Sequence, residues 1–244
     1  MRQTLDIIGV PVDKVTMAEA LEKLKLFLTE DRVHAIYTPN AEIMYDAHKD
    51  PHLKAILKQA DLLIADGAGV VLASKILGRP LPEKVPGFDL VKNSFGMPWE
   101  RKIRYFLFGS KPGIAEKARD KILGDYPGVE VVGLRNGYFT PEEDEEIVRQ
   151  INDSGADILL VALGAPKQEK WIHDHRDTLK VRVCIGCGGT LDVFAGNMGL
   201  APAFFRNNGL EWLYRLYKEP RRYKRMLKLP KYVFLALGAK IRGK

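Results

Sequence analysis

The amino-acid sequence predicts an α/β fold: a mostly parallel β-sheet flanked by helices, followed by a basic helical appendage. Short apolar runs rich in β-branched residues alternate with amphipathic stretches over roughly the first 195 residues. Alternation at this spacing is typical of a parallel sheet that is covered by helices on both faces. After Gly199 the strand-like runs stop and basic residues become frequent.

The expected strands and helices of the first part follow one another in order. Amphipathic stretches at Met17–Leu28, Ile114–Leu123 and Glu142–Ile151 have the period of surface helices. The last begins behind Thr140 and Pro141, a favoured N-cap and a proline at the first helical position. Strands are expected at Leu5–Val10, Val33–Tyr37, Leu62–Ala65, Ile103–Phe108, Val129–Leu134, Ile158–Leu163 and Val181–Ile185.

The appendage reads as three helical segments, at Gly209–Lys218, Arg221–Leu229 and Lys231–Leu237. Pro220 and Pro230 are expected to interrupt it, because proline has no N–H for the helical ladder. We therefore divide the chain into an α/β domain at residues 1–195 and a basic appendage at residues 196–244.

The charge of the chain is concentrated in this appendage. Residues 206–244 carry 12 lysines and arginines against 2 acids, a balance of +10, so residues 1–205 of this +7 chain sum to −3. The same segment contains six aromatic residues, Trp212, Tyr214, Tyr217, Tyr223, Tyr232 and Phe234. Basic and aromatic side chains together suit a partner that is anionic and apolar, and a phospholipid surface is such a partner.

The bulk composition indicates a globular protein of the cytoplasm. No apolar run approaches the roughly 18 residues of a membrane-spanning helix, and the first residues lack the apolar core of a signal peptide. We expect a cytoplasmic protein that binds peripherally to the inner face of the cell membrane. Cys184 and Cys187 have redox-motif spacing, but Cys184 lies inside an expected strand, so we interpret both as buried structural thiols.

Ligands of an open parallel sheet bind beyond the carboxyl ends of its strands. Five of the six turns that follow the expected strands contain glycine, which lets backbone N–H groups approach a phosphate. This pattern modestly favours an anionic, nucleotide-like ligand. The six turns are Thr38–Asn40, Asp66–Gly69, Gly109–Gly113, Arg135–Tyr138, Gly164–Gln168 and Gly186–Thr190.

Motifs for a bound cofactor or metal are absent from the sequence. It contains no G-x-x-x-x-G-K-[ST] motif, no G-x-G-x-x-G fingerprint and no D-x-D pair. The acidic run Glu142–Glu146 is expected to open a solvated helix, where acids complement the helix dipole. Scattered histidines make a zinc site improbable. We expect neither a cofactor nor a metal.

Asp66 is the acid that the pattern singles out. It follows the apolar run Leu62–Ala65, so its side chain is expected at the carboxyl edge of the sheet, where a carboxylate can act as a general base toward a sugar hydroxyl. The alternative is that Asp66 caps the helix that begins near Gly67. In the appendage, Arg215, Arg222 and Arg225 have helical spacing and are candidates to neutralise a diphosphate, although Pro220 lies between them.

Six blocks of the sequence resemble, in order, the signature blocks of the WecG/TagA/CpsF glycosyltransferases, and the resemblance is strongest to members that act in wall teichoic acid synthesis. They are Thr38-Pro-Asn-Ala-Glu42, Ala65-Asp-Gly-Ala-Gly-Val70, Glu83-Lys-Val-Pro-Gly87, Leu163-Gly-Ala-Pro-Lys-Gln-Glu169, Gly186-Cys-Gly-Gly-Thr-Leu-Asp192 and Gly209-Leu-Glu-Trp-Leu-Tyr-Arg-Leu216. The resemblance implies a Rossmann-like fold of the GT-E glycosyltransferase type. Residues 1–195 would then bind a nucleotide sugar, and the appendage would dock at the membrane and complete the active site.

The resemblance also implies the reaction and its partners. Such enzymes transfer N-acetylmannosamine from its UDP donor to the 4-hydroxyl of N-acetylglucosamine on a polyprenyl diphosphate, with inversion and without a metal. The partners expected are therefore a UDP-sugar, the lipid-linked acceptor and the cytoplasmic membrane surface. Association into oligomers in solution is left open.

Site residues follow from the same resemblance. Asp66 matches the proposed general base, Thr38 and Gln168 match polar pocket residues, and Arg215, Arg222 and Arg225 match the arginines of the appendage. The remaining candidates for substrate binding are Asn40, Lys84, Tyr138, Gly164, Gly188, Gly189 and Asp192, with Tyr138 and Asp192 toward the uridine and its ribose. Lys84 stands where the family commonly has arginine, and a lysine supplies charge without a bidentate fork.

Two alternatives remain at this stage. One is a member of the same family with another donor, such as the uronic acid form of UDP-N-acetylmannosamine. The other is a nucleic-acid-binding module with the appendage as its arm. We favour the enzyme and expect no nucleic-acid partner, because an RNA-binding protein usually spreads positive charge over its folded face and residues 1–205 are net negative.

Overall fold

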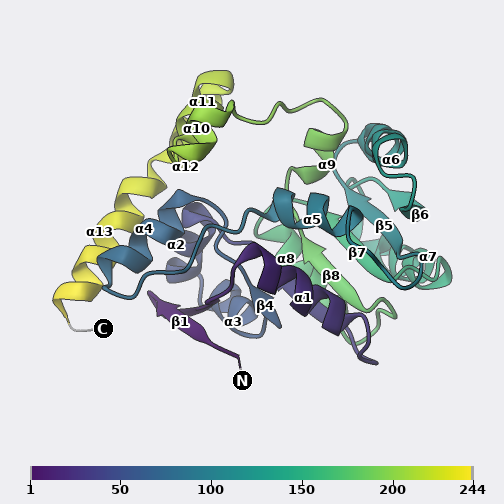
Figure 1. Cartoon of the computed structure of the whole chain (residues 1–244), viewed down its shortest axis with the longest axis horizontal. Helices are drawn as coiled ribbons and strands as arrows, with labels where there is room; N and C mark the ends of the chain where they lie inside the picture. The colour runs from purple at the N-terminus through teal and green to yellow at the C-terminus, as the bar shows by residue number, and fades with distance from the viewer. Residues whose placement is uncertain (1, 243–244) are drawn as a thin grey trace.

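The predicted parallel sheet is confirmed. A computed structural model describes residues 2–242 and the side chains of all of these except Asn207 and Arg222. Six parallel strands form one sheet in the order β4-β3-β8-β7-β5-β6 (Figure 1). Their bounds are β3 His34–Tyr37, β4 Leu62–Leu63, β5 Arg104–Gly109, β6 Glu130–Arg135, β7 Ile158–Ala162 and β8 Val183–Gly186.

The strand expected at Leu5–Val10 is confirmed only as far as Ile7, and it lies outside the parallel sheet. The chain there forms a separate antiparallel hairpin of β1 (Thr4–Ile7) and β2 (Val10–Asp13). Its turn consists of Ile8 and Gly9, which both have positive φ, 57° and 82°. Two consecutive residues with positive φ form the two-residue hairpin turn that matches the twist of its strands. Isoleucine rarely adopts positive φ, so the apolar run Leu5–Val10 gave no sign of a turn.

Helices cover both faces of the sheet, and each face has its own apolar cluster. One cluster contains residues of α1 (Met17–Phe27), α5 (Gly87–Phe95), α6 (Ile114–Asp125) and α9 (Thr190–Phe194). The other contains residues of α2 (Ala41–Lys49), α3 (Pro51–Lys58), α4 (Ala68–Ile76), α7 (Asp144–Asp153) and α8 (Lys167–His175). Strand residues alternate between them: Ile36 packs in the first cluster, while Ala35 and Tyr37 pack in the second.

Local capping explains where several helices begin. Thr16 forms a capping box with Glu19 at the start of α1, and Asp50 accepts two N–H groups at the start of α3. Thr140 forms a second capping box with Glu143, and the predicted helix behind it is confirmed, with a first 3-10 turn η1 (Pro141–Glu143) ahead of α7. Cys184 and Cys187 are buried free thiols, as predicted, and burial raises the pKa of both to about 12.

The appendage is helical and returns along the side of the sheet. It comprises α10 (Ala203–Asn207), α11 (Glu211–Lys218), η2 (Pro220–Arg222), α12 (Tyr223–Met226) and α13 (Lys228–Ile241). Figure 1 shows the connection from α9 crossing to α10 and α11, after which α13 descends beside α4 and α2. The interruption at Pro220 is confirmed. The interruption expected at Pro230 is wrong. Pro230 lies in the first turn of α13, where a backbone N–H has no partner within the helix, so its absence in proline costs no helical hydrogen bond.

α13 belongs to the core of the α/β part. Tyr232 and Ala236 are fully buried and join the apolar cluster of α2 and α4. Tyr232 therefore does not face a membrane, contrary to our grouping of it with the other aromatic residues of the appendage. The division at residue 195 stays a prediction, since the appendage begins after α9 but shares this core.

Candidate active site

The polar residues that follow the strands gather along the carboxyl edge of the sheet, in two neighbouring groups. The first lines a cleft beyond β5, β6, β7 and β8, and the second surrounds Asp66 beyond β4. The turn after β8 lies between them, because β8 pairs with β3 on one side and β7 on the other.

The cleft has a volume of about 700 Å³ and brings together five of the predicted substrate-binding residues. Tyr138, Gly164, Gly188, Gly189 and Asp192 all line it. Glycine turns form much of its wall, as expected for a site that admits a phosphate. Its other lining residues are Ser110, Lys111, Gly137, Phe139, Thr140, Glu143, Ala162, Leu163 and Lys167.

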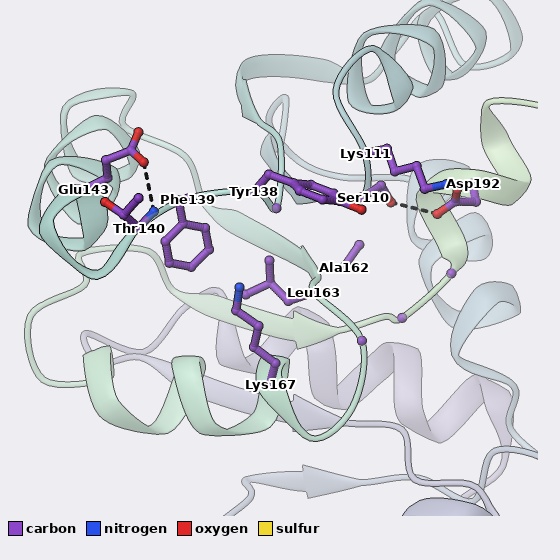
Figure 2. Close-up of a pocket in the computed structure, with 14 residues that line it drawn as sticks. Ser110, Lys111, Tyr138, Phe139, Thr140, Glu143, Ala162, Leu163, Lys167 and Asp192 are labelled. Carbon is purple, nitrogen blue, oxygen red and sulfur yellow. Dashed lines mark hydrogen bonds between the residues drawn. The ribbon is translucent and has the colours of Figure 1, made fainter. Parts of the chain in front are cut away.

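The two sides of the cleft differ in chemistry. Ser110 Oγ donates a hydrogen bond of 2.8 Å to Asp192 Oδ2, which holds that carboxylate at the rim beside Lys111 (Figure 2). The Tyr138 ring is 63% exposed, so a flat face is open to a ligand. Lys167 reaches from the start of α8 toward Leu163, with its ammonium group 4.1 Å from the centre of the Phe139 ring. An aromatic platform, a carboxylate and two lysines can together hold a base, a ribose and a diphosphate.

Asp66 lies half-buried at the other end of the carboxyl edge, among charged groups from two segments, α11 and the stretch before α5. Desolvation is the largest influence and raises the pKa of Asp66 to about 6, with Glu211 adding to the rise. Arg215, Lys84 and the backbone N–H of Gly87 act in the opposite direction. A carboxylate that titrates near neutrality is suited to general-base catalysis.

The alternative role of Asp66 as a helix cap is wrong. The N-cap of α4 is Gly67, and no side chain caps that helix. The carboxylate instead faces the N–H of Gly87, the first residue of α5, which acts to lower the pKa of Asp66, as expected where a helix dipole favours an anion. Asp66 therefore does not cap the helix that follows it.

Thr38 sets the position of this helix start. It is buried, and its Oγ1 donates a hydrogen bond of 3.0 Å to the carbonyl of Gly186, which joins the ends of β3 and β8. Gly87 lies directly on it: a Cβ at residue 87 would come within 2.9 Å of Thr38 Oγ1. Thr38 thus lies beneath the site and packs against Gly87, whose N–H acts on the Asp66 carboxyl.

Two other predicted residues also position backbone. Gln168 is buried; its Oε1 accepts the Gly188 N–H at 3.0 Å and its Nε2 donates to Glu169 at 2.9 Å, so it fixes the turn between the two groups. Burial raises the pKa of that Glu169 carboxyl. Asn40 caps α2, with its Oδ1 accepting the N–H groups of Glu42 and Ile43 at 3.0 and 3.1 Å.

The appendage reaches the Asp66 group through its second helix. Gly209, with φ +70°, lies against the start of α4, where a Cβ would come within 2.7 Å of the Ala68 Cβ. This close approach places Arg215 near Asp66. Arg225 instead pairs with Glu42 of α2, at 2.7 Å between Nε and Oε2. The predicted role of Arg222 concerns a side chain outside the described part of the chain.

Sequence reasoning missed four residues of the two groups. Ser110, Lys111 and Lys167 stand in turns that are expected to face a ligand, so their position after a strand was a usable signal. Glu211 gave no such signal, because an acid at the start of a helix ordinarily complements the helix dipole. Its Oε1 lies 2.5 Å from Lys84 Nζ.

Two negative findings concern only residues 2–242. Within that range no three histidine, cysteine or acidic side chains gather closely enough to hold a metal ion. Nor does any helix there have both the length and the hydropathy needed to cross a membrane.

Comparison with known proteins identifies the family. The model of the glycosyl transferase WecG/TagA/CpsF family matches residues 5–244. A protein of Bacillus spizizenii is 37% identical over 211 residues, 86% of this chain and 81% of its own length. A protein of Bacillus subtilis is 34% identical over 96% of this chain and 91% of its own length. A protein of Staphylococcus aureus is 32% identical over 97% of this chain and 93% of its own length.

All three relatives carry the name N-acetylglucosaminyldiphosphoundecaprenol N-acetyl-beta-D-mannosaminyltransferase. The match includes the appendage as well as the α/β part. The six sequence blocks predicted this relationship, and it is confirmed: the chain belongs to the WecG/TagA/CpsF family of glycosyltransferases.

Proposed function

We propose that this protein transfers N-acetylmannosamine from UDP-N-acetylmannosamine to the 4-hydroxyl of N-acetylglucosaminyl-diphospho-undecaprenol, with inversion. The observation that carries the proposal is Asp66, a base of pKa about 6 beside Arg215 of the appendage. The names of the relatives support the acceptor and the sugar. The product is the disaccharide that links wall teichoic acid to its lipid carrier.

The proposed reaction is a single displacement. Asp66 takes the proton from the acceptor hydroxyl. At the same time the hydroxyl oxygen of the acceptor forms a bond to the anomeric carbon of the donor sugar. The bond from that carbon to the diphosphate breaks, and UDP leaves with the electron pair. Arg215 is a cation beside Asp66, and we assign to it the stabilisation of the negative charge that develops on the departing diphosphate. No metal enters this scheme.

We place the donor nucleotide in the cleft. Tyr138 would stack on the uracil, Asp192 would accept from the ribose hydroxyls, and Lys111 and Lys167 would face the diphosphate. The glycine turn at Gly188 and Gly189 separates this cleft from Asp66. A nucleotide bound there would direct its sugar toward the general base.

Tyr138→Ala is expected to weaken UDP binding about 10-fold, because base stacking on an aromatic ring contributes about 1–3 kcal/mol. Isothermal titration with UDP measures this. Tyr217→Ala serves as the control, since Tyr217 is 78% exposed on α11 and away from the cleft. Equal UDP affinity in wild type and Tyr138→Ala would remove the uracil from this position.

We further propose that the appendage docks on the inner face of the cytoplasmic membrane, where the lipid-linked acceptor resides. Of the 14 large apolar side chains exposed in the described chain, ten lie between residues 200 and 241. They include Phe204, Trp212, Tyr217, Phe234 and Ile241. Each basic residue near an anionic leaflet adds about 1 kcal/mol, so several of them suffice for reversible docking.

The protein is expected to sediment with vesicles that contain phosphatidylglycerol and to stay in solution with phosphatidylcholine alone. High salt should release it, because salt screens exposed charges. Phe234→Ser should weaken the binding, whereas Leu26→Ser, at another exposed apolar position on α1, should not. Preferential capture of RNA over these vesicles would instead favour the nucleic-acid alternative.

The direct test of the proposed function is a donor panel. UDP-N-acetylmannosamine, its uronic acid and UDP-N-acetylglucosamine are each incubated with a short-chain polyprenyl-diphosphate-N-acetylglucosamine, with and without EDTA, and the products are read by mass spectrometry. We expect one added N-acetylmannosamine and no effect of EDTA. Transfer of the uronic acid alone would move the protein to the other donor class, and a need for added magnesium would contradict the arginine-based scheme.

A further inference from the structure

Glu211 is an acid that lies close enough to Asp66 to raise the pKa of its carboxyl. The groups that act on the Asp66 carboxyl are Arg215 and Glu211 from α11, Lys84 from the segment before α5, and the Gly87 N–H. Neither the sequence pattern nor the proposed displacement gives Glu211 a task. A second carboxylate beside a catalytic one repels it, so its presence calls for an explanation.

The contacts of Glu211 explain why a second carboxylate lies near Asp66. Its Oε1 lies 2.5 Å from Lys84 Nζ, across the boundary between the appendage and the α/β part. Both side chains are mostly buried, with 30% and 25% of their surfaces exposed. Lys84 Nζ also lies 3.5 Å from the backbone carbonyl of Arg206. The lysine ammonium is therefore held by two oxygens of the appendage.

Lys84 would otherwise have another partner. Its charge already acts on Asp66, and an ammonium group freed from Glu211 could pair directly with that carboxylate. A base that is engaged in an ion pair is a poor proton acceptor. A lysine side chain can turn in this way because its charge sits on a flexible stem.

We propose that Glu211 is a positioning residue that holds the Lys84 ammonium away from Asp66, so that the carboxylate stays free to accept the acceptor's proton. This inference rests on the proposed function. The rest of the appendage is held independently, by the pairs Arg225–Glu42 and Lys228–Asp46, both at 2.7 Å, and by the buried Tyr232. Loss of the Glu211 charge thus leaves the contacts of α12 and α13 with α2 in place.

The proposal predicts opposite effects of the two partners on the pH profile of turnover. Glu211→Gln removes a like charge and frees Lys84 to approach Asp66, so the acidic midpoint of kcat should fall by roughly half a unit or more. Lys84→Met removes a favourable charge, so its midpoint should rise. In the double variant the two changes oppose each other, and the midpoint should return close to that of wild type.

Two further variants separate this role from a structural one. Lys84→Arg keeps the ion pair and should keep the wild-type midpoint. Asp46→Asn breaks another lysine–carboxylate contact between the appendage and the α/β part, that of Lys228 with α2. Neither Asp46 nor Lys228 is among the groups that shift the pKa of Asp66, so this variant should not move the midpoint. A general loosening of the appendage would lower kcat in Glu211→Gln without lowering its midpoint.

The decisive experiment is the set of kcat–pH profiles of the full-length variants, together with the Asp66 carboxyl titration by carbon NMR. A midpoint in Glu211→Gln that is unchanged or higher than in wild type overturns the proposal. The NMR titration gives the same comparison without turnover, so failure of the proposed function, seen as no transfer from any donor, remains distinct from failure of this inference.

Discussion

Asp66→Asn is expected to lower kcat by at least about 100-fold, the lower end of the effect of a general base. Asparagine keeps the size of the side chain and can still accept the Gly87 N–H through its amide oxygen, but it cannot take a proton from the acceptor. UDP affinity should stay unchanged, because Asp66 does not line the cleft. Steady-state kinetics and titration with UDP measure the two quantities.

The same variant should fold at least as stably as wild type at pH 7.5. The pKa of Asp66 is about 6 in the folded protein, above its ordinary value, so folding favours the protonated form. The stability linked to that proton is present below about pH 4 and is lost as the pH rises through 6. At neutral pH asparagine removes the free-energy cost of burying an ionised carboxylate. The thermal unfolding temperatures of the variant and of wild type at pH 7.5 test this expectation.

Asp120→Asn is the matched control, since Asp120 is a largely exposed acid of α6 paired only with its neighbour Arg119. It should leave kcat unchanged. Turnover of Asp66→Asn within about threefold of wild type would remove Asp66 from the role of general base.

The second large effect is expected for Arg215→Gln. If Arg215 stabilises the charge on the leaving diphosphate, its loss should lower kcat by about 100-fold or more, as for other groups that stabilise a developing anion. KM for the donor should change little, because the cleft holds the nucleotide. Lys218→Gln, three residues further along the same helix, removes an equal charge and should retain near-wild-type kcat. Comparable losses in both variants would mean that α11 contributes only general positive charge.

A point substitution tests the appendage more cleanly than its deletion. Removal of residues 196–244 would take away Tyr232 and Ala236, which are fully buried against α2 and α4. The newly exposed apolar surface would destabilise the α/β part. Loss of activity in such a truncation would therefore not separate catalysis from folding.

The sheet and its ligand-facing edge could be predicted because both follow from local patterns. Period-2 and period-3.6 runs give the strands and helices, and residues after parallel strands must meet at one edge. The turns that contain Tyr138 and Gly164 were expected at one edge on this ground, whereas Asp192 was assigned from the family resemblance. Asp66 was found by the same rule.

The predictions that failed concern features that depend on contacts between segments far apart in the sequence or on the conformation of the folded chain. The positive φ of Ile8 is imposed by the hairpin and leaves no trace in an apolar run. Pro230 lies at a helix start, which the position of a proline alone does not distinguish from an interruption. The pairing of Glu211 with Lys84 joins residues from two ends of the chain, and only the packed appendage brings them together.

The closest test of the account is the pH dependence of kcat in wild type and in Arg215→Gln. Wild-type turnover should rise with pH through a midpoint near 6, where Asp66 loses its proton. Without the Arg215 charge the ionised form is less favoured, so the midpoint should move to higher pH. An identical midpoint in the two proteins would show that the carboxylate and the appendage arginine do not share one site.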